Sequence, residues 1–364
     1  MSRRSSGRAL ATVTTVLAAT ALQPLAARAE HRPAHGRRAP IRYVALGDSF
    51  SSGPLVSLPQ RGAPLGCLRS NNNYPSLVSR ALRVASFTDV SCDGARTDHM
   101  TKAQTGLLGG RSNPPQFSAL TRDTTLVSLT IGGNDIGFSH SFRCAVYAFT
   151  APRGAPCMKA FTKNGIDRYR VAIRAAAPNV RAVLRGIRER SPHADVYLLN
   201  YLRLLPATGT GCFPVVPVAH GDVRYLRGVQ EDLNRMLAVQ ASAAGVTYVD
   251  VSAPGHDMCQ RIDRRWVEGI PARPAAPVHP NAAGMRAMAH YLLAAIRTRS
   301  DAARVQAASH RVSRRASRGV PRRVSPRMSR GVRGRTARQD AGRWQVSSAQ
   351  AGSRLSVRVR GSSG

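Results

Sequence analysis

The chain has 364 residues and carries 54 lysines and arginines against 19 aspartates and glutamates, a formal net charge of +35. No known nucleic-acid-binding motif and no interleaved aromatic residues accompany the basic side chains, so nothing supports a dedicated nucleic-acid binder. Aromatic residues make up only 5% of the sequence, and this argues against a surface that stacks on sugar rings.

The N-terminal residues 1–29 have the three parts of a secretory signal peptide. Arginines come first, an apolar stretch follows, and Ala27-Arg28-Ala29 forms a cleavage site. A retained membrane anchor is the alternative, but the stretch contains Gln23 and Pro24 and is short for a bilayer span. We therefore expect a secreted, extracellular protein whose mature chain starts with a linker of residues 30–40, exported by either the general or the twin-arginine route.

Residues 41–300 amount to one domain, long enough to bury a substantial core. Five short apolar runs predict strands at residues 41–46, 85–90, 124–131, 195–199 and 246–251. Apolar residues at helical spacing predict helices at residues 167–190, 222–243 and 280–296. Because strands and helices alternate, we expect an α/β fold: a three-layer α/β/α sandwich with a central, mostly parallel five-stranded sheet.

From about Asp301 onward the sequence changes character. Residues 301–364 contain 16 arginines against two aspartates, so this segment alone carries a net charge of +14. With no apolar period, it cannot bury enough apolar surface to offset the entropy of ordering, and we expect a disordered tail. The tail could contact lipid surfaces or anionic polymers transiently, or it could be a dispensable solvated extension.

All six cysteines fall within the central domain: Cys67, Cys92, Cys144, Cys157, Cys212 and Cys259. An even count in an exported chain predicts disulfides, although six cysteines allow many pairings. Pairing of nearest neighbours would close three modest loops. Because no C-x-x-C spacing occurs, we expect no metal site, and nothing in the sequence indicates another cofactor.

The first predicted strand ends in a sharp turn, Gly47-Asp48-Ser49-Phe50. Such a turn presents the Ser49 hydroxyl at the edge of an α/β sheet where ligands bind. Serine acts as a nucleophile only when a base takes its proton and donors stabilise the oxyanion, so the chain must supply both. Asp48 is expected to fix the turn through hydrogen bonds to the backbone.

Glycine-marked turns also follow the second and third predicted strands. In a parallel sheet these turns emerge at the same edge as Ser49. The Gly94 N–H can donate to an oxyanion, and Asn134 offers a side-chain amide at the same place. We interpret the neighbouring Asp135 as a turn and capping residue.

His279 stands in a short segment, Pro277-Val278-His279-Pro280-Asn281, just before the last predicted helix. The other histidines of the domain have no motif around them, and we expect them to be structural or exposed. Taken singly, each of these signals is weak. Their order and their placement at strand ends are what make them informative.

These four segments make the chain similar to the GDSL or SGNH hydrolases, and most closely to the secreted lipases and esterases of filamentous actinobacteria. The resemblance covers roughly residues 41–295. Its blocks are Gly47-Asp48-Ser49 with Gly53, then Gly94, then Gly132-Gly133-Asn134-Asp135, and finally His279-Pro280-Asn281. It implies the SGNH hydrolase fold and sequential disulfides: Cys67–Cys92, Cys144–Cys157 and Cys212–Cys259.

The resemblance also implies a serine carboxylester hydrolase. Ser49 would attack the ester carbonyl, and His279 would take its proton as general base. The oxyanion would be held by the N–H groups of Ser49 and Gly94 and by the Asn134 side chain. Such an enzyme needs an ester or lipid substrate and no cofactor, and we expect a monomer.

The chain departs from the family pattern at one position. The usual acidic partner of the histidine stands three residues before it, where this sequence has Ala276. A backbone carbonyl of Ala276 or Pro277 would then orient the imidazole, which makes a Ser–His dyad. A distant carboxylate such as Asp257 or Asp263 is the alternative.

The leading hypothesis is a lipase or esterase, whose acyl-chain and head-group preference the sequence leaves open. The alternatives are a phospholipase A-type enzyme, a polysaccharide acetyl esterase, and a non-enzymatic, basic surface-binding protein on an inactive hydrolase fold. Residues 204–206 and 215–218 are apolar. They could line an acyl pocket or pack the loop that contains Cys212.

Overall fold

The computed structural model describes residues 40–138, 142–270 and 275–318. The predicted signal peptide, nearly all of the predicted linker and residues 319–364 of the predicted tail lie outside this part. The chain divides into two units, residues 1–305 and 306–364. The described part of the second unit is the end of helix α7 (Ala282–Arg318).

Five parallel strands form the central sheet, in the order β2-β1-β3-β6-β7. The strands are β1 (Arg42–Gly47), β2 (Ser86–Asp89), β3 (Leu126–Thr130), β6 (Asp195–Leu199) and β7 (Thr247–Val249). Strand β1 lies between β2 and β3, so that Tyr43 is opposite Phe87 on one side and Leu126 on the other. The predicted parallel five-stranded sheet is confirmed.

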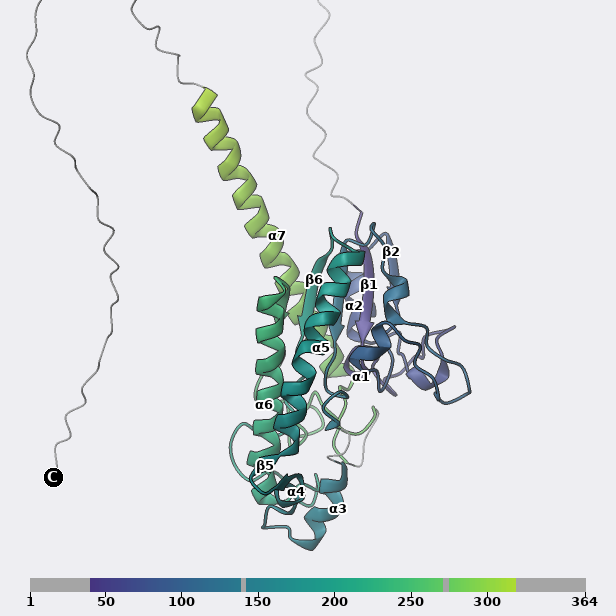
Figure 1. The fold of residues 1–364 in the computed structure, drawn as a ribbon, viewed down its shortest axis with the longest axis vertical. Helices are drawn as coiled ribbons and strands as arrows, with labels where there is room; N and C mark the ends of the chain where they lie inside the picture. Colours follow the sequence, from purple (N-terminus) through teal and green to yellow (C-terminus); the bar gives the residue numbers. More distant parts are fainter. Residues whose placement is uncertain (1–39, 139–141, 271–274, 319–364) are drawn as a thin grey trace, which may run out of the picture. The chain divides into compact units, whose positions relative to one another are not determined.

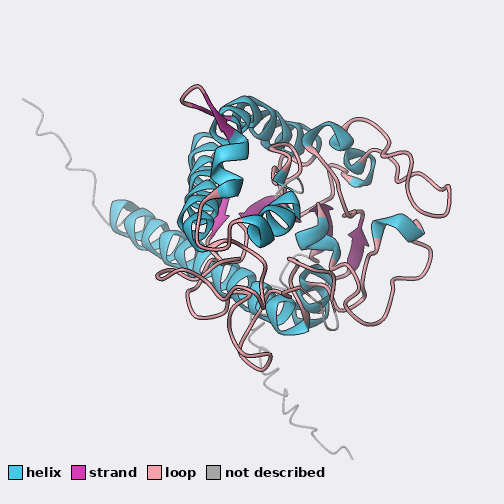
Figure 2. Ribbon diagram, turned by 90° about the horizontal axis from the view of Figure 1, so that it is seen from below, coloured by secondary structure: helices cyan, strands magenta, loops and turns pink. Residues whose placement is uncertain are grey.

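Helices cover the sheet on both sides, as Figure 2 shows in a view along the strands. Helices α5 (Arg168–Arg190) and α6 (His220–Ala243) run side by side (Figure 1). Helix α2 (Tyr74–Leu82) contacts helix α7: the Tyr74 N–H donates to the Met285 sulfur over 3.3 Å. The predicted three-layer α/β/α sandwich and its three long helices are confirmed.

Strand β3 shows why the central strands are largely apolar on both faces. All five of its residues are buried, because both faces of the sheet are covered. The hydroxyls of this strand are satisfied: Ser128 Oγ lies 2.5 Å from the Tyr43 hydroxyl and 3.3 Å from the Tyr74 hydroxyl, and the Thr130 hydroxyl donates to Asp48 Oδ1. Val127 and Leu129 point to the opposite face, as strand alternation requires.

Helix α7 corrects one expectation. The segment from Asp301 was expected to be disordered, but the helix runs on to Arg318. The reason is intrinsic propensity: residues 301–308 are rich in alanine with arginine and glutamine, which favour helix without any buried face. The absence of an apolar period says nothing about this intrinsic helix propensity.

Several short elements were not predicted. They are α1 (Ser49–Ser52), α2, α3 (Phe142–Thr150), α4 (Pro156–Phe161), the antiparallel pair β4 (Thr162–Lys163) and β5 (Ile166–Asp167), and three 3₁₀ turns at Leu65–Cys67, Thr97–Met100 and Gln116–Ala119. Most belong to the long connections that follow the strands. Short turns of this kind carry too few residues for a periodic pattern to reveal them.

Three disulfides are present, and they join the cysteines in sequential order: Cys67–Cys92, Cys144–Cys157 and Cys212–Cys259. This pairing agrees with the one that the family resemblance implied. Within the described ranges, no helix is both long enough and apolar enough to span a membrane.

The strand order places a ligand-binding crevice between β1 and β3. From β1 the chain proceeds to β2 on one side, whereas β3, β6 and β7 follow on the other side. The connections therefore diverge at the carboxyl ends of β1 and β3. In open α/β sheets, ligands bind at this switch point.

Candidate active site

The turn after β1 depends on a glycine at its first position. Gly47 has φ 126°, and a Cβ atom there would lie 2.4 Å from the Thr130 carbonyl oxygen. The next residue, Asp48, caps helix α1: its Oδ1 accepts hydrogen bonds from the Phe50 N–H at 3.0 Å and the Thr130 hydroxyl at 2.6 Å. Asp48 thus fixes the turn, and Ser49 becomes the first residue of α1 at the crevice.

The turns after β2 and β3 lie against each other through Asn134. Its side-chain amide donates to the Ala95 carbonyl over 2.9 Å. Because an amide carries two N–H bonds, this contact fixes the side chain and leaves the second N–H for a ligand. Gly94, next to Ala95, has φ 72°, a left-handed conformation that glycine adopts without strain.

The structure brings the four predicted residues to one cavity of about 650 Å³. Ser49, Gly94, Asn134 and His279 all line it, although they come from four separate segments of the chain. Ser49 is only 6% exposed, so the nucleophile candidate lies at the floor of a protected site. The arrangement can hold an acyl group with its carbonyl between a hydroxyl, an imidazole and hydrogen-bond donors.

The imidazole of His279 is oriented by the main chain. Its Nδ1 lies 2.8 Å from the Pro277 carbonyl oxygen, and its backbone N–H donates to the Ala276 carbonyl over 3.2 Å. An N–H on Nδ1 that donates to Pro277 leaves the lone pair on Nε2, where a base needs it. The alternative carboxylates have other partners: Asp257 accepts from the Cys259 N–H, and Asp263 pairs with Arg261.

The loop before His279 is held against residues 266–268. The Val278 N–H donates to the Glu268 carbonyl, and the Glu268 N–H donates to the His279 carbonyl, over 2.8 and 2.9 Å. Asn281 accepts from the Gly284 N–H and so caps α7, while its amide donates to the buried Glu268 carboxylate. Val278 itself has φ 64°, which is rare for a β-branched residue and is maintained only by these surrounding contacts.

Asp93 is the carboxylate that faces the reactive edge of the imidazole. Its Oδ1 lies 4.0 Å from His279 Nε2. Burial lowers the pKa of His279 below its ordinary value, and the Asp93 charge opposes this by favouring the imidazolium. Burial also raises the pKa of Asp93, with the His279 charge acting in the opposite direction. Sequence reasoning did not single out Asp93, although it directly precedes Gly94.

A buried hydroxyl joins the two main turns of the site. Tyr201 donates from its hydroxyl to Asp48 Oδ2 over 2.5 Å and accepts from the Gly133 N–H over 2.7 Å. Burial raises the pKa of Asp48 to about 7, against the lowering effect of the hydrogen bonds from Thr130 and Tyr201. Sequence reasoning missed Tyr201, but its position two residues after strand β6 is a signal that could have found it.

We expect Tyr201→Phe to loosen this part of the site. The substitution leaves the Gly133 N–H and the buried Asp48 Oδ2 without their partner, which should cost about 1–3 kcal/mol in the free energy of unfolding. Urea denaturation measures the loss. Tyr291→Phe is the control, because its hydroxyl lies outside this network. Equal stability of the two variants would show that Tyr201 has no structural role here.

Asp135 and His99 both form hydrogen bonds to the segment Arg96-Thr97. Asp135 accepts hydrogen bonds from the backbone and side chain of Thr97, the first residue of a 3₁₀ turn, which matches the predicted capping role. His99, expected to be structural or exposed, lines the cavity. Its Nδ1 accepts from the Arg96 N–H over 3.0 Å, so the ring is held in place by its own turn.

We expect Asn134→Ala to lower kcat by about 10²–10³, as loss of one oxyanion donor does in other hydrolases. Because the Ala95 carbonyl already holds the amide in place, the amide does not have to reorient when negative charge develops on the substrate. Steady-state kinetics on a soluble ester separate kcat from KM. A change in KM alone would make Asn134 a residue that binds substrate and not the transition state.

A second, narrow cavity of about 40 Å³ adjoins the first. The two share Phe138, Leu204 and Val278. The smaller one is otherwise lined by apolar residues: Ala145, Leu205, Val216, Pro217, Val218, Leu226, Met258 and Ile270. The segments 204–206 and 215–218, whose role the sequence left open, therefore both contribute to an apolar extension of the main cavity.

Comparisons with known proteins agree with this geometry. The sequence profile of the GDSL-like Lipase/Acylhydrolase family matches residues 45–287. Lipase 2 of Streptomyces coelicolor is 39% identical over 263 residues, which is 70% of this chain and 85% of that protein.

Two solved structures are similar along nearly their whole length. The extracellular lipase of Streptomyces rimosus has a TM-score of 0.56 and 26% identity, covering 69% of this chain and 99% of that one. The phospholipase A1 of Streptomyces albidoflavus has a TM-score of 0.55 and 29% identity, covering 68% of this chain and 96% of that one.

Proposed function

The chain belongs to the GDSL-like lipase/acylhydrolase family and is a hydrolase that acts on esters; on this premise we propose that it is a secreted carboxylester hydrolase of the lipase or esterase type. The observation that carries the proposal is the shared cavity of Ser49, His279, Gly94 and Asn134. These residues supply a nucleophile, a base and oxyanion donors, which together suffice for acyl transfer to water.

The reaction proceeds in two steps. The Ser49 oxygen attacks the ester carbonyl while His279 Nε2 takes the hydroxyl proton, and the tetrahedral oxyanion accepts hydrogen bonds from the Ser49 and Gly94 N–H groups and the Asn134 amide. Its collapse breaks the ester bond, and His279 returns the proton to the leaving alcohol. Water then attacks the acyl-enzyme with the same base, which releases the acid and restores Ser49.

The imidazolium that forms in each step is stabilised without a triad aspartate. The Pro277 carbonyl, 2.8 Å from Nδ1, orients the ring and accepts its N–H. This supports a Ser–His dyad. The Asp93 carboxylate adds negative charge from the Nε2 side.

The acyl group extends into the apolar part of the cavity. Leu204 and Phe138 lead from the main cavity to the narrow extension that Val216 and Met258 help to line. An alkyl chain gains free energy there in proportion to the apolar surface that it buries. This favours acyl esters over acetylated polysaccharides, since the half-buried Trp266 is stacked on His256 and does not line the cavity.

Hydrolysis of p-nitrophenyl esters of increasing chain length tests the proposal. We expect turnover of soluble esters, its complete loss after reaction with a serine-directed phosphonate, and a kcat/KM that rises from acetate to medium-chain esters. Absence of turnover with every chain length would refute the assignment. A maximum at acetate would refute the acyl-chain site and favour an acetyl esterase.

A phospholipase A-type activity is the second candidate. The similarity to the phospholipase A1 of Streptomyces albidoflavus supports it. Release of fatty acid from dispersed phosphatidylcholine, compared with release from a triacylglycerol, distinguishes the two substrates. The three disulfides support export to an oxidising compartment, where the enzyme would act outside the cell.

A further inference from the structure

Four leucines stand out among the surface residues. Leu55, Leu58, Leu65 and Leu108 are 59%, 63%, 61% and 67% exposed. Along the described ranges, no other leucine is found among the exposed large apolar side chains. Scattered apolar residues on a surface are ordinary, but these four belong to only two loops, residues 53–70 and 101–113. We call the four side chains the leucine platform.

The two loops are joined at the platform. The Gly66 N–H donates to the Leu108 carbonyl over 3.1 Å, and a Cβ atom on Gly109 would lie 3.5 Å from the Leu65 Cβ. Leu65 and Leu108 therefore lie next to each other. Leu55 and Leu58 have φ 59° and 68°, a left-handed conformation that leucine rarely adopts and that only surrounding contacts maintain.

The two loops that contain the leucine platform are fixed to the turn after β2. The Cys67–Cys92 disulfide ties the first loop to the turn after β2. The buried Arg69 donates to the Ser91 carbonyl over 2.6 Å and to Asn113 Oδ1 over 3.2 Å, which connects both loops to the same turn. The backbones of Gln104 and Asn113 exchange two hydrogen bonds that close the second loop.

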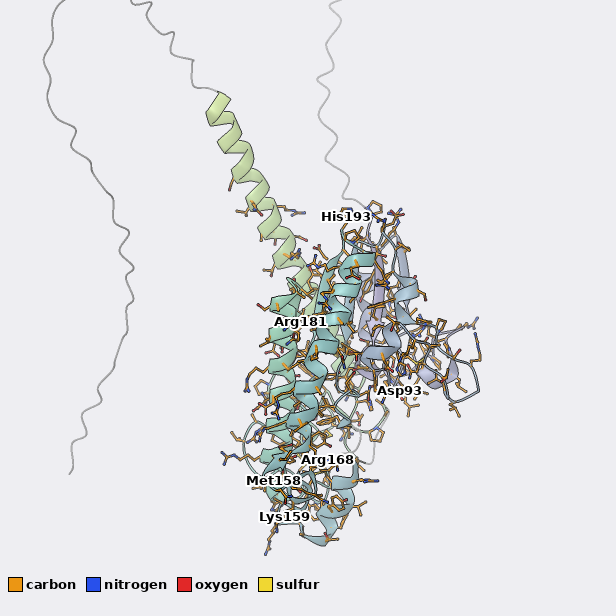
Figure 3. The ribbon with its side chains drawn as sticks, viewed as in Figure 1. Asp93, Met158, Lys159, Arg168, Arg181 and His193 are labelled. Atoms are coloured by element: carbon orange, nitrogen blue, oxygen red, sulfur yellow. A yellow bond between two sulfur atoms is a disulfide. The ribbon has the colours of Figure 1, made fainter. Side chains whose placement is uncertain are left out.

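Both loops also border the catalytic cavity. The Asp93 N–H donates to the Cys67 carbonyl over 3.1 Å, and Gln104 of the second loop lines the cavity itself. Figure 3 labels Asp93 on the side of the sheet from which these loops extend. At the other end of the first loop, the Pro54 carbonyl accepts from the Ala276 N–H in the segment before His279.

All charged side chains in the two loops are positively charged. They contain Arg61, Arg69, Lys102 and Arg111 and neither an aspartate nor a glutamate. Arg69 is buried, whereas Arg61, Lys102 and Arg111 are exposed in the same two loops as the leucines. Exposed aliphatic side chains flanked by cations match the two layers of an anionic membrane surface, acyl chains below and phosphate groups above.

We propose that the leucine platform docks this enzyme on an anionic phospholipid surface, with its leucines in the acyl layer and the flanking cations at the phosphates. The cavity is thereby brought to the interface where lipid esters are present. This inference rests on the proposed ester hydrolase function, because only an enzyme with a lipid substrate gains from such a position.

The test uses the full chain and the double variant Leu65→Ser/Leu108→Ser, whose side chains do not line the cavity. Partition onto phosphatidylglycerol vesicles is measured by co-sedimentation in low salt and in high salt, which screens the Arg-rich C-terminal segment. Val239→Ser is the matched control, since Val239 is an apolar residue of α6, 55% exposed and outside both loops. Hydrolysis of soluble p-nitrophenyl butyrate and of emulsified tributyrin is measured in parallel.

We expect the double variant to lose on the order of 10-fold in partition coefficient per leucine at high salt, with a parallel loss on tributyrin. Its kcat/KM on p-nitrophenyl butyrate should stay within about twofold of wild type, because the chemistry is untouched. Arg61→Ser should reduce binding to phosphatidylglycerol in low salt but not to phosphatidylcholine.

Partition of the double variant equal to that of Val239→Ser would overturn the proposal. Equal binding of the wild type to phosphatidylglycerol and phosphatidylcholine in low salt would overturn its anionic part. Failure of the wild type to hydrolyse p-nitrophenyl butyrate would instead refute the proposed function, whatever the vesicles show.

Discussion

Ser49→Ala should abolish ester hydrolysis while the protein stays folded. We expect kcat to fall by at least about 10⁴-fold, because loss of the nucleophile removes the covalent route and leaves only binding and the oxyanion donors. The substitution deletes one oxygen from the first residue of α1 and keeps its backbone N–H, so the turn that Gly47 and Asp48 build is preserved.

Ser52→Ala is a matched control for this prediction. Ser52 lies in the same helix and is fully buried, and its hydroxyl has no hydrogen-bond partner within the part of the chain that the structure describes. Its loss should change neither kcat nor the free energy of unfolding appreciably. If Ser49→Ala and Ser52→Ala were equally active on p-nitrophenyl butyrate, the acyl-enzyme mechanism would be wrong.

Much of this site could be predicted because its residues follow strands. Ser49, Gly94 and Asn134 each come just after an apolar run, and parallel strands bring such positions to one edge of the sheet. The local sequence was therefore enough to predict that these three residues lie at one edge of the sheet. The fold itself was predictable for the same reason, since strands with both faces buried and amphipathic helices leave clear periodic patterns.

The residues that were missed act across long distances in the chain. The Tyr201 hydroxyl contacts Asp48, 153 residues away, and Asp93 approaches His279 from a different loop. No local pattern records such a pairing, because it depends on how loops of irregular backbone are folded against one another. The exposure of the four leucines could not be predicted either. A loop has no periodic pattern from which a buried position can be told from an exposed one.

His279→Ala should cost as much as Ser49→Ala, on the order of 10⁴-fold or more in kcat, because the proposed mechanism needs His279 to take the Ser49 proton. If the Pro277 carbonyl is the orienting group, no single carboxylate should matter comparably. We expect Asp257→Asn and Asp263→Asn to keep kcat within about tenfold of wild type, far from the ~10⁴ that a tautomer-fixing aspartate contributes in a triad protease.

Asp93→Asn gives the sharpest form of this prediction, because Asp93 acts on Nε2 and not on Nδ1. Its negative charge favours the imidazolium and so raises the pKa of His279, against the lowering caused by burial. Catalysis needs the neutral imidazole, and kcat/KM therefore rises with pH through this pKa. Removing the charge lowers the pKa, so the acid limb of the pH profile should move to lower pH, with at most a modest loss at its plateau. An acid limb that stays in place, or a plateau loss as large as that of His279→Ala, would mean that Asp93 does not act as a distant charge, and the second result would give it a direct part in proton transfer at Nε2.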